Sequence, residues 1–148
     1  MTLLYKDSQM IMLSARNQIQ GKIKSISRGE VTSEVVIVTS TGVEISSIIT
    51  LGSCVRMSLE PGDNVTAVVK SSNVILAVGS DFAISCRNNI SGIIKKIISG
   101  PVNNEIIIDA LGTELVSVIT QNSVKRLGLK EGMKVSALIK ASSVIVMK

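Results

Sequence analysis

Several residue types that build catalytic sites are scarce or absent in this chain of 148 residues. It has no histidine and no tryptophan, and it has one phenylalanine and one tyrosine. Without histidine the chain lacks the usual general acid–base group, the Ser-His-Asp triad and the commonest zinc ligand. With so few aromatic rings it also lacks the stacking platforms that hold single-stranded nucleic acids. The composition therefore argues against an enzyme and against nucleic-acid binding as the main role.

Cysteine and long apolar runs are also scarce. The two cysteines, Cys54 and Cys86, form no CxxC pair, which predicts reduced thiols rather than a disulfide framework. Apolar residues make up 45% of the chain but occur in short runs, and no run approaches the length that crosses a bilayer. The first residues do not have the pattern of a signal peptide. We therefore expect a cytoplasmic protein with no membrane partner, and the net charge of +5 favours an anionic ligand.

What the chain does have is an internal repeat. Ser14–Glu34 and Ser85–Glu105 are identical at 11 of 21 aligned positions. A period near 70 residues is too long for a solenoid unit and fits a small domain. The repeat predicts an N-terminal extension at residues 1–12, a first module at 13–79 and a second module at 84–148.

Each module carries the patterns of five short strands and one short helix. Alternating apolar residues and β-branched runs predict the strands. Thr50 is a candidate cap for a helix within residues 50–59, and the second copy repeats this helix at 123–129. The order β-β-β-α-β-β predicts a mainly β fold of two tandem OB-like five-stranded β-barrel modules, each with one short helix. We expect each copy to supply its own fifth strand, at 73–78 and 143–147.

The residues that repeat most clearly are hydrogen-bond donors. Arg and Lys supply positive charge, while Ser and Thr supply directed hydroxyl donors, a combination that suits a small oxyanion. The set contains no carboxylate, so we do not expect a bound metal cation. The candidate donors are Ser14, Arg16, Thr50, Ser53 and Lys70, with their counterparts Ser85, Arg87, Thr120, Ser123 and Lys140.

Each of these residues also has a plain structural explanation. The threonines could serve only as helix caps, and the lysines could be solvated strand ends. Arg16 and Arg87 could instead form structural ion pairs with glutamates. Asn17 and Asn88 are predicted to hold a turn rather than to touch ligand. The repeated glutamates are predicted to lie on solvated strand faces, namely Glu34, Glu105, Glu44 and Glu114.

Three short motifs resemble those of a known family. They are Ser-Ala-Arg-Asn-Gln at 14–18, Thr-x-x-Ser at 50–53 and Lys-Ser-Ser at 70–72. Together they resemble the molybdate-binding Mop (TOBE) domain, and two such modules in tandem resemble a di-Mop molbindin. The resemblance covers roughly residues 13–148. It implies an OB-like fold, molybdate or tungstate as bound ligand without an organic cofactor, a role in storage or homeostasis, and a homotrimer.

The resemblance also implies a distribution of the site residues. Ser14, Ala15 and Arg16 would reach the oxyanion from one module, and a facing module would supply the remaining contacts. One departure is that Ala141 stands where the first copy has Ser71, so the second copy lacks one hydroxyl donor. The facing set is Thr50, Ser53, Lys70 and Ser71, and the second copy's set is Ser85, Cys86, Arg87, Thr120, Ser123, Lys140 and Ala141.

Two other functions stay open on the sequence alone. OB-like barrels often bind single-stranded nucleic acid, and the mild basic charge permits this. A molybdate sensor that acts through a separate protein partner is the second alternative. The high apolar content of such small modules also predicts self-association.

Overall fold

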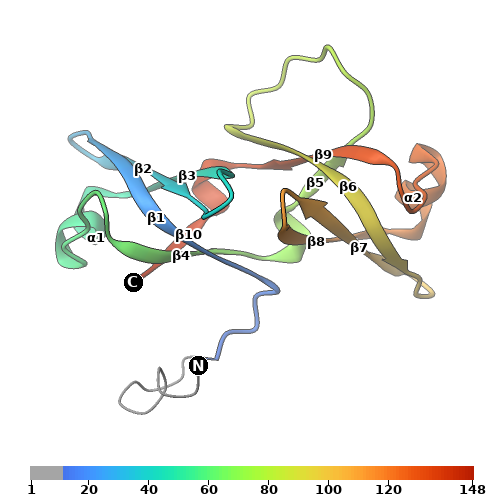
Figure 1. The fold of residues 1–148 in the computed structure, drawn as a ribbon, viewed down its shortest axis with the longest axis horizontal. Helices are drawn as coiled ribbons and strands as arrows, with labels where there is room; N and C mark the ends of the chain where they lie inside the picture. The colour runs from blue at the N-terminus through green and yellow to red at the C-terminus, as the bar shows by residue number, and fades with distance from the viewer. Residues whose placement is uncertain (1–11) are drawn as a thin grey trace.

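The computed structural model describes residues 12–148, so all of the expected N-terminal extension except Met12 lies outside the described residues. Both halves have the same order of elements (Figure 1). The first half contains β1 (Asn17–Arg28), β2 (Thr32–Val38), β3 (Glu44–Thr50), α1 (Leu51–Arg56), β4 (Asn64–Val69), the 3-10 turn η2 (Ser71–Asn73) and β5 (Ile75–Ala77). The second contains β6 (Asn88–Ile98), β7 (Asn103–Ala110), β8 (Thr113–Thr120), α2 (Gln121–Leu127), β9 (Lys134–Ile139), η3 (Ala141–Ser143) and β10 (Ile145–Met147).

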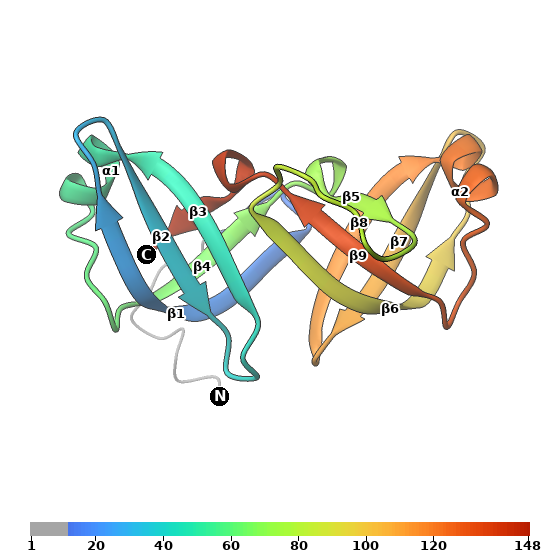
Figure 2. The same cartoon turned by 90° about the horizontal axis from the view of Figure 1, so that it is seen from above.

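The predicted fold class is confirmed: the described part of the chain is mainly β, with two five-stranded sheets in total and one short α-helix in each half. The helix α1 is shorter than its expected range, and α2 begins two residues earlier than expected. Both begin directly after the predicted cap and its counterpart, Thr50 and Thr120. In Figure 2 the two barrels lie side by side, with α1 and α2 at the outer ends of the molecule. No helix in residues 12–148 is long and apolar enough to cross a membrane.

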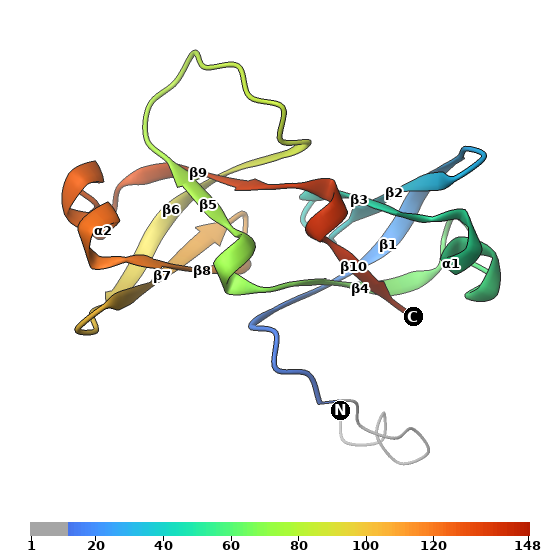
Figure 3. The same cartoon turned by 180° about the vertical axis from the view of Figure 1, so that it is seen from behind.

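The fifth strand of each sheet comes from the other half of the chain. The strand orders are β10-β4-β1-β2-β3 and β5-β9-β6-β7-β8. Ile145 is paired with Val68, and at the equivalent position Ile75 is paired with Leu138. Figures 1 and 3 show β10 returning from the second half to lie against β4. The expectation that each copy closes its own module is therefore wrong, and the halves are intertwined.

The physical reason for this error is that the two copies are nearly equivalent. β5 pairs with β9 in the same register in which β10 pairs with β4. The sequence pattern of either fifth strand is therefore compatible with either sheet. The direction of the chain after the 3-10 turn decides the pairing. At each crossing η2 packs against β8 and η3 packs against β3, so each turn lies on the half that receives the strand.

Buried serines fasten the crossing segments. Ser47 on β3 donates its hydroxyl to the Val144 carbonyl at 2.6 Å, and Ser117 on β8 donates to the Val74 carbonyl at 2.6 Å. Both serines are fully buried. A buried carbonyl without a hydrogen-bond partner is costly. Each serine hydroxyl supplies that partner just before the exchanged strand, where strand pairing has not yet begun.

Buried asparagines form a second link between the halves. The Asn17 amide donates to the Val116 carbonyl at 2.8 Å and accepts from the Val116 N–H at 2.7 Å. Asn88 makes the same pair of bonds with Ser46, at 2.8 and 2.7 Å, and also donates to the Ile139 carbonyl at 3.2 Å. The prediction that these asparagines hold a turn is therefore wrong. Each amide pairs with the backbone of the third strand of the opposite half.

The core of each barrel is built from aliphatic residues, as the lack of aromatic rings requires. One glycine in each half permits a close approach between neighbouring strands. A Cβ atom on Gly21 would lie 2.6 Å from the Val38 carbonyl oxygen, and Gly92 faces Asp109 in the same way. Only glycine fits there without displacing the neighbouring strand.

Candidate functional site

The two repeated arginines meet glutamates of the opposite copy. Arg16 Nη1 lies 2.8 Å from Glu105 Oε1, and Arg87 Nη2 lies 3.0 Å from Glu34 Oε2. All four side chains are partly exposed to solvent. The ion pairs that were the structural alternative for the arginines are therefore present. The two glutamates, predicted to be merely solvated, are the residues of this region that sequence reasoning missed.

The position of each glutamate places the arginine near a Thr–Ser pair. Glu105 is paired with Val118 across β7 and β8, and Thr120 lies two residues further along the same strand. Since alternate residues share a face, Thr120 lies on the Glu105 face, about 7 Å further along the strand. In the other half Glu34 is paired with Ile48, two residues before Thr50. Each arginine therefore lies beside the helix start of the opposite copy.

Each threonine caps its helix, as predicted. Thr50 Oγ1 accepts from the Ser53 N–H at 3.1 Å and lies 2.9 Å from Ser53 Oγ. Thr120 and Ser123 repeat both distances. The threonines are exposed and the serines partly exposed. The cap thus orients a pair of hydroxyl groups without removing it from solvent.

The residues that flank β1 and β4 gather at the junction of the halves. Ser14, Ala15 and Lys70 line one cavity of about 480 Å³. Ser71 then begins η2, which packs on β8 of the opposite half. The cavity is otherwise mostly apolar and is lined by Leu13, Met57, Val68, Ile145, Val146, Met147 and Lys148.

The expected grouping of Lys70 and Ser71 with Thr50 and Ser53 is not found within a half. Asn17, beside Lys70, is paired with Val69 at the start of β1, whereas Thr50 follows the end of β3 near the far end of β1. Figure 2 shows the same separation: α1 lies at the outer end and η2 near the middle. The antiparallel pairing of β4 with β1 is the reason, because it places the end of β4 that leads into Lys70 and Ser71 beside the start of β1.

The second copy has the mirror arrangement with one hydroxyl group fewer. Lys140 precedes η3, which packs on β3, and Ala141 is buried, so this turn offers no hydroxyl at that position. Ser85 is exposed and Cys86 partly buried, just before β6. Cys54 and Cys86 are free thiols.

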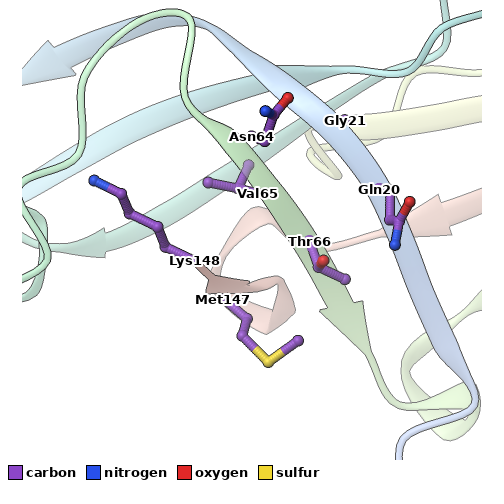
Figure 4. A pocket seen from close by; sticks show the side chains of 7 residues that line it. All are labelled: Gln20, Gly21, Asn64, Val65, Thr66, Met147 and Lys148. Carbon is purple, nitrogen blue, oxygen red and sulfur yellow. The ribbon is translucent and has the colours of Figure 1, made fainter. Parts of the chain in front are cut away.

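A second cavity lies apart from the candidate oxyanion residues. A cavity of about 360 Å³ lies over β1, β4 and β10, and its lining contains none of the candidate oxyanion residues (Figure 4). Lys148 extends away from the amide of Gln20 and donates to the Ser58 carbonyl at 3.0 Å. It also pairs with Asp63 at 3.1 Å. The Glu60 backbone N–H and this lysine lower the pKa of Asp63 below its ordinary value.

The fold and the site together define a class of protein. The protein has two intertwined small barrels, and one arginine of each copy pairs with a glutamate of the other copy, whose strand partner lies two residues before Thr50 or Thr120. Residues 13–76 and 84–146 each match the TOBE domain. The chain therefore belongs to the TOBE domain family and carries two such (Mop) domains in tandem.

Relatives and a solved structure agree with this assignment. The chain is 40% identical over 136 residues to the molybdenum-pterin-binding protein MopA of Rhodobacter capsulatus, covering 90% of this chain and 51% of MopA. It is 38% identical over 141 residues to the molybdenum transport protein ModE of Azotobacter vinelandii, covering 94% of this chain and 52% of ModE. The chain thus spans about half the length of these curated relatives. The cytoplasmic molybdate-binding protein ModG, solved with molybdate bound, shares 38% identity and a TM-score of 0.89, over 93% of this chain and 99% of that chain.

Proposed function

We propose that this protein binds molybdate or tungstate at two related sites per chain and performs no chemistry on the anion. The first site takes Ser14, Ala15, Arg16, Lys70 and Ser71 from the first copy, with Thr120 and Ser123 from the second. The other takes Ser85, Cys86, Arg87, Lys140 and Ala141 from the second copy, with Thr50 and Ser53 from the first. No metal cation and no organic cofactor is part of the proposal.

The observation that carries the proposal is the delivery of each arginine to the opposite copy. Arg16 and Arg87 reach across the junction to equivalent glutamates, and each contact lies about 7 Å along the strand from an exposed Thr–Ser pair. Guanidinium and ammonium groups balance the charge of a dianion, and hydroxyl donors address its oxygens. The likeness to ModG, whose structure holds molybdate, supports the same ligand class here.

The experiment that tests this is a calorimetric titration of anion-free protein with molybdate and tungstate, with sulfate and phosphate as controls. We expect more than one metal oxyanion per chain and much weaker sulfate binding. Bound anion should stabilise the native state by about 2.7 kcal/mol at a hundredfold excess over Kd. If neither metal oxyanion produces heat or a thermal shift, the proposal is wrong.

The oligomeric state and the cellular role belong to the same proposal. We propose a cytoplasmic homotrimer that stores or buffers the anion. Exposed apolar residues recur at equivalent positions of the two halves, which supports association through repeated contacts. These pairs are Leu13 and Ile84, Val31 and Val102, and Ile75 and Ile145. Light scattering should give about three times the chain mass of 15.7 kDa, and a monomer mass would exclude the trimer.

The alternatives are distinguished by the same titrations. Phe82, the only aromatic residue within 12–148, lies between β5 and β6 and on no strand, so the described barrels offer no stacking surface for single-stranded nucleic acid. Salt-dependent binding of an oligonucleotide by a protein that ignores molybdate would favour that function instead. A sensor would bind molybdate and, in addition, retain a partner protein only in one anion state.

A further inference from the structure

The glutamates that hold the two arginines have no part in the sites described above. Glu34 and Glu105 are equivalent positions of the repeat, as are Arg16 and Arg87. The pairs cross between the copies in both directions, at 2.8 and 3.0 Å. An accidental surface contact would not be expected to recur in both halves with partners exchanged. The recurrence indicates that the Arg–Glu pair is a regular part of both contacts between the halves.

Building on the proposed function, we propose that Glu105 and Glu34 are anion-displaced latches. In the anion-free protein each glutamate carboxylate is paired with the guanidinium group that the oxyanion would bind. When molybdate enters, the arginine exchanges its carboxylate partner for the oxyanion. The glutamates are positioning residues that set the affinity threshold of each site rather than ligands.

The geometry of the contacts suits such an exchange. Each contact uses one guanidinium nitrogen, and residues 12–148 engage no other N–H donor of either arginine, so these donors can meet an incoming anion. The arginine side chains are 48% and 58% exposed, and an ion pair so open to solvent contributes little stability. A dianion that also gains hydroxyl and ammonium contacts can therefore displace the carboxylate.

The charge of the glutamate also acts against weak ligands. A carboxylate beside the guanidinium repels any anion and must be displaced before the anion gains the arginine. A small monoanion gains too little to offset this loss, whereas a tetrahedral dianion that reaches several donors gains more. The latch therefore favours dianions that contact the whole donor set over the chloride that is always present.

The test uses charge-removing variants of the full chain. Glu105→Gln and Glu34→Gln remove the counter-charge and keep the size of the side chain. Glu44→Gln is the matched control, because Glu44 forms a similarly exposed pair with Lys24 at 2.7 Å and contacts neither arginine. We expect molybdate to bind about two- to fivefold tighter to one class of sites in each latch variant, the range that exposed ion pairs support. Glu44→Gln should bind like the unmodified protein.

The outcomes separate the latch from the proposed function. If the unmodified protein binds molybdate and the latch variants bind it equally well or more weakly, the latch is wrong. A purely structural ion pair would instead lower the melting temperature of the anion-free protein and leave affinity unchanged. If the unmodified protein binds no molybdate, the proposed function is wrong and the latch falls with it. Greater inhibition of molybdate binding by chloride in the latch variants would further support the proposal.

Discussion

The two halves share one topology but end their helices differently. α2 is capped at its C-terminus by Gly128, which has a φ of 63°, the left-handed conformation that glycine adopts at little cost. In the first half Ser58 takes a φ of 50° just after the end of α1, and Lys148 donates to the carbonyls of Met57 and Ser58. A cation at a helix C-terminus is favourable. One half thus uses glycine where the other uses a strained serine and a lysine brought by the exchanged strand.

This comparison shows how intertwining couples the two halves. Lys148 belongs to the second copy in sequence, yet it supports the helix end and the Asp63 loop of the first. The pKa of Asp63 is lower in the folded protein than its ordinary value of 3.8. The ionised Asp63 carboxylate therefore contributes to folding stability above pH 3.8, and this contribution is lost as the pH falls through the pKa of the folded state. The stability of one barrel therefore depends on the sequence of the other copy.

The largest difference should appear at the two asparagines that link the halves. Asn88→Ala removes three hydrogen bonds and Asn17→Ala removes two, leaving buried backbone groups without partners. We expect losses of about 3 and about 2 kcal/mol in the free energy of unfolding, measured in urea. Asn89→Ala, at an exposed neighbouring position, is the control and should change stability by less than about 0.5 kcal/mol. Equal, small effects at Asn17 and Asn88 would contradict their role.

Exchanging the residues that follow the two helices, Gly128 and Ser58, should produce smaller changes in stability, which are opposite in sign for the two substitutions. Gly128→Ser introduces a side chain in the left-handed region and should cost about 1 kcal/mol. Ser58→Gly relieves the same strain in the first half and should stabilise the protein by about 0.5 kcal/mol. Thermal unfolding of both variants measures the difference. Two changes of the same sign would show that backbone conformation does not explain the asymmetry.

The smallest effect is expected where a buried hydroxyl lacks a partner. Ser33 Oγ is buried and has no hydrogen-bond partner among residues 12–148, whereas the equivalent Asn104 accepts from the Gly100 N–H at 3.2 Å. Ser33→Ala should therefore leave stability unchanged or raise it by up to about 1 kcal/mol. Asn104→Ala should lower it by about 1 kcal/mol. A clear loss in Ser33→Ala would mean that its hydroxyl has a partner, such as a bound water.

Much of the fold follows from the sequence because its causes are local. Alternation of apolar residues located the strands, and the Thr50 cap located the first helix, whereas the second helix begins two residues before its expected range. The exchange of β5 and β10 could not be predicted, since two copies with the same strand pattern make the two pairings equivalent in sequence. The burial of Asn17 and Asn88 was missed for a related reason. A buried side-chain amide that pairs with the backbone of the other half leaves no pattern in the sequence around it.

The sequence supplies the candidate site as a set of residues, but it does not supply their arrangement. Repetition of the donor residues identified the candidates, and the structure then grouped Arg16 with the Glu105 face of the opposite copy. That grouping depends on the strand exchange and so lay outside the reach of sequence pattern. The glutamates left a signal, since Glu34 and Glu105 repeat together with the arginines, but repetition alone does not reveal that the partners cross.

The most direct test of the account is whether Arg16 and Thr120 serve one site. Equilibrium dialysis with molybdate would compare the double variant Arg16→Ala/Thr120→Ala with Arg16→Ala/Thr50→Ala. The account predicts that the first loses one class of sites and keeps the other at its original affinity, while the second weakens both classes. The reverse result, with both classes weakened in the first variant and one class spared in the second, would contradict the cross-copy site.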